Sequence, residues 1–186
     1  DKQAAAQQRT GVLVIGIGWG HERVHDYAPA PLRGGTGGAD EFARFIGEEL
    51  VPRIEKDYPA AAGRQYRGII GHSAGGLFAA HCFVGHNELF AHYIALSPSL
   101  WVGDQVVLVR EKELRTNNTT GNGSFFLAVG ELEQELMQPP IALFQKTLHD
   151  YYPRYTQGFY IARGLDHMSS KNTTIPKALS FYFQQQ

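Results

Sequence analysis

The sequence has a single cysteine, Cys82, in 186 residues. One cysteine excludes an intrachain disulfide framework and a metal site built from several thiolates, and it is compatible with a reducing or an oxidising compartment. Runs of lysine or arginine are also missing, and 17 basic residues against 18 acidic ones leave a formal net charge of -1. Because a surface that binds a phosphate backbone needs clustered cations, we expect no nucleic-acid partner.

Long apolar runs are absent as well. The longest one near the start, residues 12–17, is far too short to span a bilayer, and no basic segment precedes it as in a signal peptide. We therefore expect a mature soluble protein without a membrane span. The length, with 43% apolar residues, fits one core, and we expect a single domain over residues 1–186.

Short apolar runs alternate with segments of helical period along the chain. Continuous β-branched runs bounded by glycine predict buried strands, and apolar residues at helical spacing predict amphipathic helices. Strands are expected at residues 11–16, 67–71, 93–96, 125–129 and 158–161, and helices at residues 41–56, 75–84, 140–151 and 175–183. This alternation predicts an α/β fold with a mostly parallel sheet and helices on both faces.

Two segments in the amino-terminal half of the chain are less regular than this alternation. Residues 18–38 contain six glycines and two prolines without a sustained period, which predicts a loop. In the helix at residues 41–56, Asp40 is the expected N-cap, and Pro52 is expected to kink the helix.

Residues 71–75, GHSAG, fit the G-x-S-x-G nucleophile elbow, in which a sharp strand-to-helix turn exposes the serine. Glycine is expected there because neighbouring backbone crowds the turn. A strand is predicted directly before the motif and a helix directly after it, which is the context that the motif requires. Ser73 is therefore the candidate nucleophile. The alternative is a glycine-rich turn whose serine merely caps the helix.

A serine hydroxyl needs a base within hydrogen-bond reach, and an acid should orient that base. In α/β hydrolases the histidine comes last in the chain, in a loop after a strand. His167 lies between the last predicted strand and the final helix, so it is the candidate base. His149 falls inside a predicted helix, which favours a surface role.

The candidate acids follow the strand at residues 125–129. Glu131 and Glu133 both stand at the carboxyl edge of the sheet, and we favour Glu133 for its reach to His167. Asp166, beside the histidine, is a weaker third candidate. A solvated acidic turn is the alternative for the glutamate pair.

Pairs of histidines also raise the question of a metal. His21 and His25 are four residues apart, and His81 and His86 are five apart, but no H-E-x-x-H motif occurs and the first pair falls in the predicted loop. We therefore expect no catalytic metal. The glycines at residues 16–20 lack the spacing of a dinucleotide fingerprint, so no nucleotide cofactor is expected.

Taken together, four stretches resemble the esterase D superfamily, and within it the enterobactin and salmochelin (ferric siderophore) esterases. They are VIGIGW at residues 14–19, RVHDYAP at residues 23–29, GHSAGGLF at residues 71–78 and SPSLW at residues 97–101. The second stretch narrows the resemblance from hydrolases in general to the siderophore branch.

This resemblance implies a three-layer α/β-hydrolase sandwich that cleaves the ester bonds of a tricatecholate trilactone through an acyl-enzyme and so aids iron release. Ser73 and His167 fall on the nucleophile and base of the family. Glu133 falls where relatives place an acid, although some siderophore esterases use a Ser-His dyad. The implied partner is a ferric or iron-free catecholate, no cofactor is implied, and we expect a bacterial periplasm or cytoplasm, the periplasm being favoured.

The resemblance also suggests residues that bind the substrate. Arg23 falls on a position that faces the anionic catecholate in relatives, where a guanidinium suits clustered phenolate oxygens. An ion pair between Arg23 and Asp26 is the alternative. Trp19 and Trp101 are candidates for aromatic walls beside catechol rings, with core packing as the alternative.

The chain departs from the family at its start. Relatives begin with several more strands, including one whose turn supplies a backbone N–H to the oxyanion hole, so Ala74 is the donor expected here. We therefore expect an architecture without the amino-terminal strands, whose strand at residues 11–16 presents a bare edge. Two other functions stay open: a general carboxyl-ester hydrolase of the feruloyl or S-formylglutathione type, and a non-catalytic protein that binds a ferric catecholate.

Overall fold

Four parallel strands form the centre of the fold in the computed structural model, which describes residues 11–18, 22–31, 36–118 and 121–185. The strands are β1 (Gly68–His72), β2 (His92–Leu96), β3 (Gly123–Gly130) and β4 (Tyr155–Ala162). They lie in the order β1-β2-β3-β4, and every neighbouring pair is parallel. The predicted α/β fold with a parallel sheet is confirmed.

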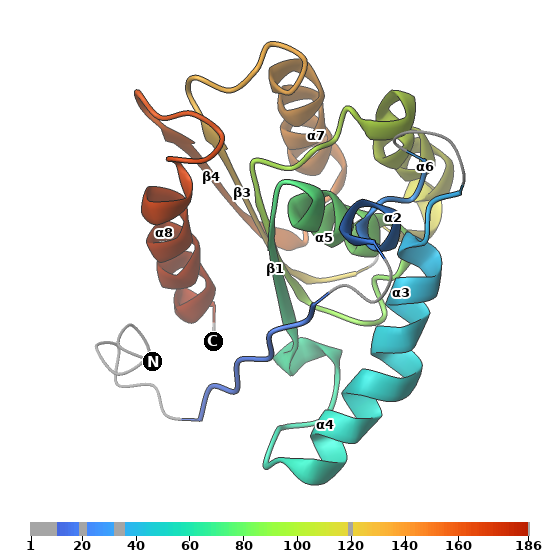
Figure 1. Cartoon of the computed structure of the whole chain (residues 1–186). Coiled ribbons are helices and arrows are strands. Elements are labelled where there is room, and N and C mark those ends of the chain that lie inside the picture. The colour runs from blue at the N-terminus through green and yellow to red at the C-terminus, as the bar shows by residue number, and fades with distance from the viewer. Residues whose placement is uncertain (1–10, 19–21, 32–35, 119–120, 186) are drawn as a thin grey trace.

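Helices cover both faces of this sheet (Figure 1). They are α2 (Arg23–Tyr27), α3 (Ala39–Phe45), α4 (Val51–Asp57), α5 (Ala74–Gly85), α6 (Val102–Asn118), α7 (Gln138–Tyr151) and α8 (Lys171–Gln184). The helices α5, α6 and α7, which connect consecutive strands, lie on one face, whereas α8 packs on the other face against β2, β3 and β4. Within the described part of the chain, no helix is long and apolar enough to cross a membrane.

The central strands β2 and β3 are buried on both faces, whereas the edge strands β1 and β4 are partly exposed. Tyr93 and Phe125 belong to the larger core under α5 and α7, and their rings stack with centroids 5.8 Å apart. The alternate residues Ile94 and Phe126 belong to a smaller core under α8. At β1, which has no other strand on its outer side among the described residues, Ile70 is 47% exposed.

The strand expected at residues 11–16 is wrong, because residues 11–18 form no strand. Val14 in this segment is 78% exposed, and Ile17 is the residue that packs partly against the core. Tyr27 donates a hydrogen bond from its hydroxyl to the Ile17 carbonyl at 3.2 Å. A β-branched run becomes a strand only when a neighbouring strand pairs with its backbone, and this segment has no such pairing.

The helix expected at residues 41–56 has three parts: α3, a π-helical turn η1 (Ile46–Leu50), and α4. Pro52 stands in the first turn of α4 and cannot donate an N–H to the preceding turn, so the disturbance expected at this proline takes the form of the π turn before it. Asp40 is not the cap: Gly38 is the N-cap residue, and the Asp40 carboxylate contacts His86 instead.

Two helices were not expected. The five-residue helix α2 lies within the segment predicted as a loop. Helix α6 connects β2 to β3, and its first turn contains three residues of left-handed backbone, Gly103, Asp104 and Gln105. Parallel strands need a long connection, which is usually a helix. The prediction of parallel strands therefore implied a helix between β2 and β3, although the apolar residues of α6 show only a weak helical period.

Candidate active site

Ser73 is the single residue between the end of β1 and the start of α5. Its backbone has φ 62° and ψ -118°, a conformation that side chains rarely adopt. Hydrogen bonds hold it there: the Ser73 N–H donates to the Leu96 carbonyl at 3.0 Å, and the Ser73 carbonyl accepts from the N–H groups of Leu77 and Ser99 at 2.9 and 3.2 Å. This strained turn has the features of a nucleophile elbow.

The glycines around Ser73 are not equally constrained. A Cβ on Gly71 would lie 2.0 Å from the Gly75 carbonyl oxygen, so only glycine fits there. A Cβ on Gly76 would lie 3.0 Å from the Leu96 carbonyl oxygen, whereas one on Gly75 would meet nothing within 4 Å. The expected crowding therefore applies to Gly71 but not to Gly75, whose Cα faces open space.

His167 and Glu133 meet at the carboxyl edge of the sheet. The turn after β3 and the turn after β4 are hydrogen-bonded through the Leu132 N–H and the Leu165 carbonyl at 3.0 Å. Gly130 permits this approach, because a Cβ there would lie 2.5 Å from the Leu165 oxygen. As a result, Nδ1 of His167 lies 2.9 Å from Oε2 of Glu133.

This contact assigns the proton on the imidazole. A carboxylate oxygen only accepts, so Nδ1 of His167 donates and Nε2 is the nitrogen that can take up a proton. The Glu133 side chain is completely buried, while that of His167 is 26% exposed. A buried carboxylate behind a partly open imidazole is the arrangement that orients a general base and stabilises its charged form.

The other two candidate acids have different partners. Oε2 of Glu131 accepts a hydrogen bond from the Gly164 N–H at 2.7 Å. Oδ1 of Asp166 accepts from the hydroxyl of Ser169 and from the N–H groups of Ser169 and Met168, and these bonds lower the pKa of Asp166. Both carboxylates thus brace the turn that carries the base, and Glu133 is the one whose carboxylate contacts the imidazole.

His72 also contacts this turn, which the sequence reasoning missed. Its Nε2 donates to the backbone carbonyl of His167 at 2.8 Å, and the two rings lie 4.7 Å apart. Burial lowers the pKa of His72. The sequence did contain a signal for this contact: His72 precedes the nucleophile in the GHSAG motif, and a residue beside the nucleophile can contact the loop that carries the catalytic base.

Ser99 is a second residue that the sequence reasoning did not single out. The Ser99 hydroxyl lies 3.4 Å from the hydroxyl of Ser73, and Ser99 is buried. It belongs to the SPSLW stretch, which passes over the nucleophile turn through the bond from the Ser99 N–H to the Ser73 carbonyl. The Ser73 hydroxyl therefore lies beside this stretch.

The structure describes three of the four residues that we expected to contact the substrate. Ala74 is the first residue of α5, so its N–H has no acceptor within the helix by position. Arg23 is exposed on α2, and Trp101 is 38% exposed just before α6, which argues against core packing of this tryptophan. Asp26 is buried and contacts Nδ1 of His25 at 3.1 Å. Trp19 lies outside the described residues.

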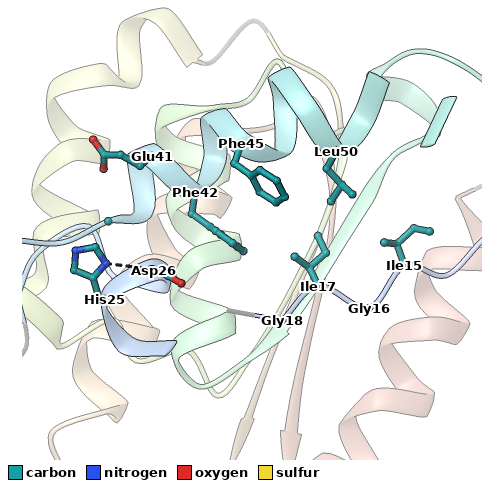
Figure 2. Close-up of a pocket in the computed structure, with 11 residues that line it drawn as sticks. Ile15, Gly16, Ile17, Gly18, His25, Asp26, Glu41, Phe42, Phe45 and Leu50 are labelled. Atoms are coloured by element: carbon teal, nitrogen blue, oxygen red, sulfur yellow. Dashed lines mark hydrogen bonds and ion pairs between the residues drawn. The ribbon is translucent and has the colours of Figure 1, made fainter. Parts of the chain in front are cut away.

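A hollow of about 640 Å³ lies between residues 15–18 and α3 (Figure 2). Apolar side chains line most of it, among them Ile15, Ile17, Phe42, Phe45 and Leu50. Ser73, His167 and Glu133 are not part of its lining. This hollow is therefore separate from the proposed site of chemistry.

Comparison with known proteins points to one group of hydrolases. Residues 1–150 match the model of the Esterase family, whose description is "Putative esterase". The ferri-bacillibactin esterase BesA of Bacillus subtilis is 33% identical over 157 residues, which cover 71% of this chain and 53% of that protein. The siderophore enterobactin esterase of Emericella nidulans is 32% identical over 133 residues, with coverage of 60% and 43%.

Solved structures give the same result. The crystal structure of the BES protein from Bacillus cereus superposes with a TM-score of 0.78 at 34% identity, covering 92% of this chain and 67% of that one. The expected resemblance to siderophore esterases and the α/β-hydrolase fold are thereby confirmed. The chain spans about half the length of the curated relatives that it matches.

Proposed function

This chain belongs to the Esterase family, and from that premise we propose that it is a serine esterase acting on a catecholate siderophore. The observation that carries the proposal is the 2.9 Å contact between Nδ1 of His167 and the buried Glu133, at the sheet edge where Ser73 forms its strained elbow. The names of the two curated relatives, a ferri-bacillibactin esterase and an enterobactin esterase, support the substrate class.

In the proposed reaction, Nε2 of His167 takes the hydroxyl proton of Ser73 as its oxygen attacks the ester carbonyl. His167 then gives this proton to the leaving alkoxide, and the acyl group stays on Ser73. Water, deprotonated by the same nitrogen, releases the acid and restores the serine. Glu133 keeps the ring in the tautomer that can accept a proton and stabilises the imidazolium.

The negative charge that develops on the carbonyl oxygen needs a donor. We assign this role to the N–H of Ala74, which follows the nucleophile and belongs to the first turn of α5. The positive end of the helix dipole adds to the stabilisation. Such preorganised donors contribute about 10²- to 10³-fold in rate each.

We assign the substrate to the tricatecholate trilactones of the enterobactin and salmochelin type, in ferric or iron-free form. The exposed guanidinium of Arg23 suits the phenolate oxygens of catechols, because it offers several donors with a permanent charge. The half-exposed ring of Trp101 offers a surface for a catechol ring. Hydrolysis of the trilactone would lower its affinity for iron and help release the metal.

Product analysis tests the proposal. The protein is incubated with iron-loaded and iron-free enterobactin and with a nitrophenyl ester, and Ser73→Ala is run in parallel. We expect linear trimer, dimer or monomer products that vanish in Ser73→Ala but persist in Ser99→Ala. Turnover of the nitrophenyl ester alone would indicate a general carboxyl esterase. Catecholate binding without any product would indicate a binding protein and contradict the catalytic assignment.

A further inference from the structure

Three side chains that bear metal-ligating atoms converge away from Ser73. Asp40 stands in the first turn of α3, His81 lies within α5, and His86 caps the end of α5. Oδ1 of Asp40 lies 3.0 Å from Nε2 of His81 and 3.0 Å from Nε2 of His86. The ligand atoms of all three lie within 4.8 Å of one another, so two imidazoles and a carboxylate surround one point.

The state of His81 calls for an explanation. This residue is 1% exposed, yet neither of its ring nitrogens makes a hydrogen bond. Its Nε2 is near Asp40 in distance, but the direction of approach is not that of a hydrogen bond. A buried polar side chain without a hydrogen bond is uncommon, and an unfilled ligand position is one physical reason for it.

We propose that Asp40, His81 and His86 bind one divalent transition-metal ion, with Zn²⁺ as the best-suited ion. Two imidazole nitrogens and one carboxylate oxygen are donors that Zn²⁺ accepts, whereas Ca²⁺ and Mg²⁺ prefer oxygen ligands alone. Tetrahedral ligands bound at about 2.0–2.1 Å from one ion lie roughly 3.3 Å apart, so the two 3.0 Å separations need only a small outward shift to admit the ion.

The surroundings of the cluster suit an ion that enters from solvent. The side chain of Asp40 is 47% exposed, which leaves a route in and a coordination position for water. Nδ1 of His86 lies 3.8 Å from the Glu88 carboxylate, which is beyond hydrogen-bond distance but adds negative charge beside this ring. The other nitrogen of that ring, Nε2, is the one turned to the cluster.

Arg110 competes for the same carboxylate. Its Nη1 lies 3.3 and 3.2 Å from the two oxygens of Asp40, so a cation already neutralises this group. The Arg110 side chain is about one-third exposed and can move aside when an ion binds. Removing its charge should therefore strengthen metal binding.

The position of the cluster gives the ion a structural role. His81 follows Ser73 by eight residues, a separation of about 12 Å along a helix, so the ion does not touch the reacting atoms. It instead joins the start of α3 to the carboxyl-terminal half of α5, the helix that begins at the nucleophile elbow. The site does not depend on the proposed esterase activity.

Zn²⁺ binding to the full chain is measured by competition with a chromophoric chelator after dialysis against a strong chelator. We expect one ion per chain, and a rise in melting temperature with Zn²⁺ but not with Mg²⁺. Asp40→Asn and His86→Ala should weaken binding by about 10-fold or more, and Arg110→Met should tighten it. Co²⁺ bound to the wild type should show visible absorption bands that His86→Ala loses.

Two control variants locate the ion. His149→Ala removes an exposed histidine that pairs with Asp150, and His167→Ala removes the imidazole of the active site; both should leave Zn²⁺ affinity unchanged. Asp40 and His86 are at least partly exposed, so the test does not depend on folding of a variant at the buried His81. Absence of one-to-one binding, or affinity unchanged in Asp40→Asn and His86→Ala, overturns the proposal.

Discussion

Nδ1 of His167 lies 2.9 Å from Oε2 of Glu133, although 34 residues separate the two in the chain. The contact joins the turns that follow β3 and β4, which are neighbouring parallel strands with their carboxyl ends at one edge. Side chains in open α/β sheets meet substrates at this edge, because the loops that carry them gather there. The same edge holds Ser73, at the end of β1.

Replacing Glu133 with glutamine should lower kcat by about 10²- to 10⁴-fold, because an amide no longer fixes the tautomer of His167 or stabilises its charged form. KM should change little, since Glu133 is buried behind the imidazole. Glu131→Gln is the matched control: its carboxylate accepts from Gly164, and we expect kcat within about threefold of the wild type. Steady-state hydrolysis of a nitrophenyl ester measures both, and equal losses in the two variants would contradict the assignment.

Two substitutions of Asp166 distinguish a structural role in the turn from a role as the acid that orients His167. Oδ1 of Asp166 accepts bonds from Met168 and Ser169 that shape the turn before α8. Asn retains this acceptor, so Asp166→Asn should keep most of the activity, whereas Asp166→Ala should loosen the turn and lower kcat. The ratio of kcat in the two variants is the measurement. If Asp166→Asn were as inactive as Glu133→Gln, Asp166 would be the acid.

Alanine substitutions separate the two glycines of the elbow. In Gly71→Ala the new Cβ would meet the Gly75 carbonyl at 2.0 Å, so we expect a loss of about 3 kcal/mol or more in the free energy of unfolding, together with loss of hydrolysis. Gly75→Ala meets no neighbour and lies in a helix, so its stability should be unchanged or higher by up to about 1 kcal/mol. Urea denaturation compares the two, and similar stabilities would show that the turn relaxes around Gly71→Ala.

His92 should make stability depend on pH. Its Nε2 donates to the Gln65 carbonyl at 3.1 Å and its Nδ1 accepts from the Ser124 hydroxyl at 2.9 Å, while burial lowers its pKa from 6.5. Below about pH 6.5 the unfolded chain therefore binds a proton that the folded chain does not, and the free energy of unfolding falls as the pH falls.

The variant His92→Gln keeps a donor but does not titrate. Its free energy of unfolding, measured in urea at pH 7.5, 6.5 and 5.5, should fall less steeply than that of the wild type. Comparison of the two slopes removes the contributions of other histidines, because these are common to both proteins. Equal slopes over this range would mean that His92 is protonated as readily in the folded chain as in the unfolded one.

The predictions from sequence succeeded where the signal was local. Short apolar runs predicted all four strands, most directly the central strands β2 and β3, which are buried on both faces and therefore apolar. The strand expected at residues 11–16 was wrong. Its composition is that of a strand, but a strand also needs a neighbouring strand to pair with, and local sequence does not reveal whether one is present. Asp40 was expected to cap a helix, and the distant His86 decides its orientation instead.

The sequence by itself therefore determined the strand-turn-helix unit around Ser73, the chain order of β1 to β4 with α5, α7 and α8, and the place of His167 after the last strand. Tertiary structure alone decided which of Glu131, Glu133 and Asp166 touches His167, because that choice depends on how two turns from adjacent strands meet. It also brought Asp40 to His81 and His86, a grouping across two helices that no spacing in the sequence encodes. Contacts between elements depend on packing, and packing is a property of the folded chain as a whole.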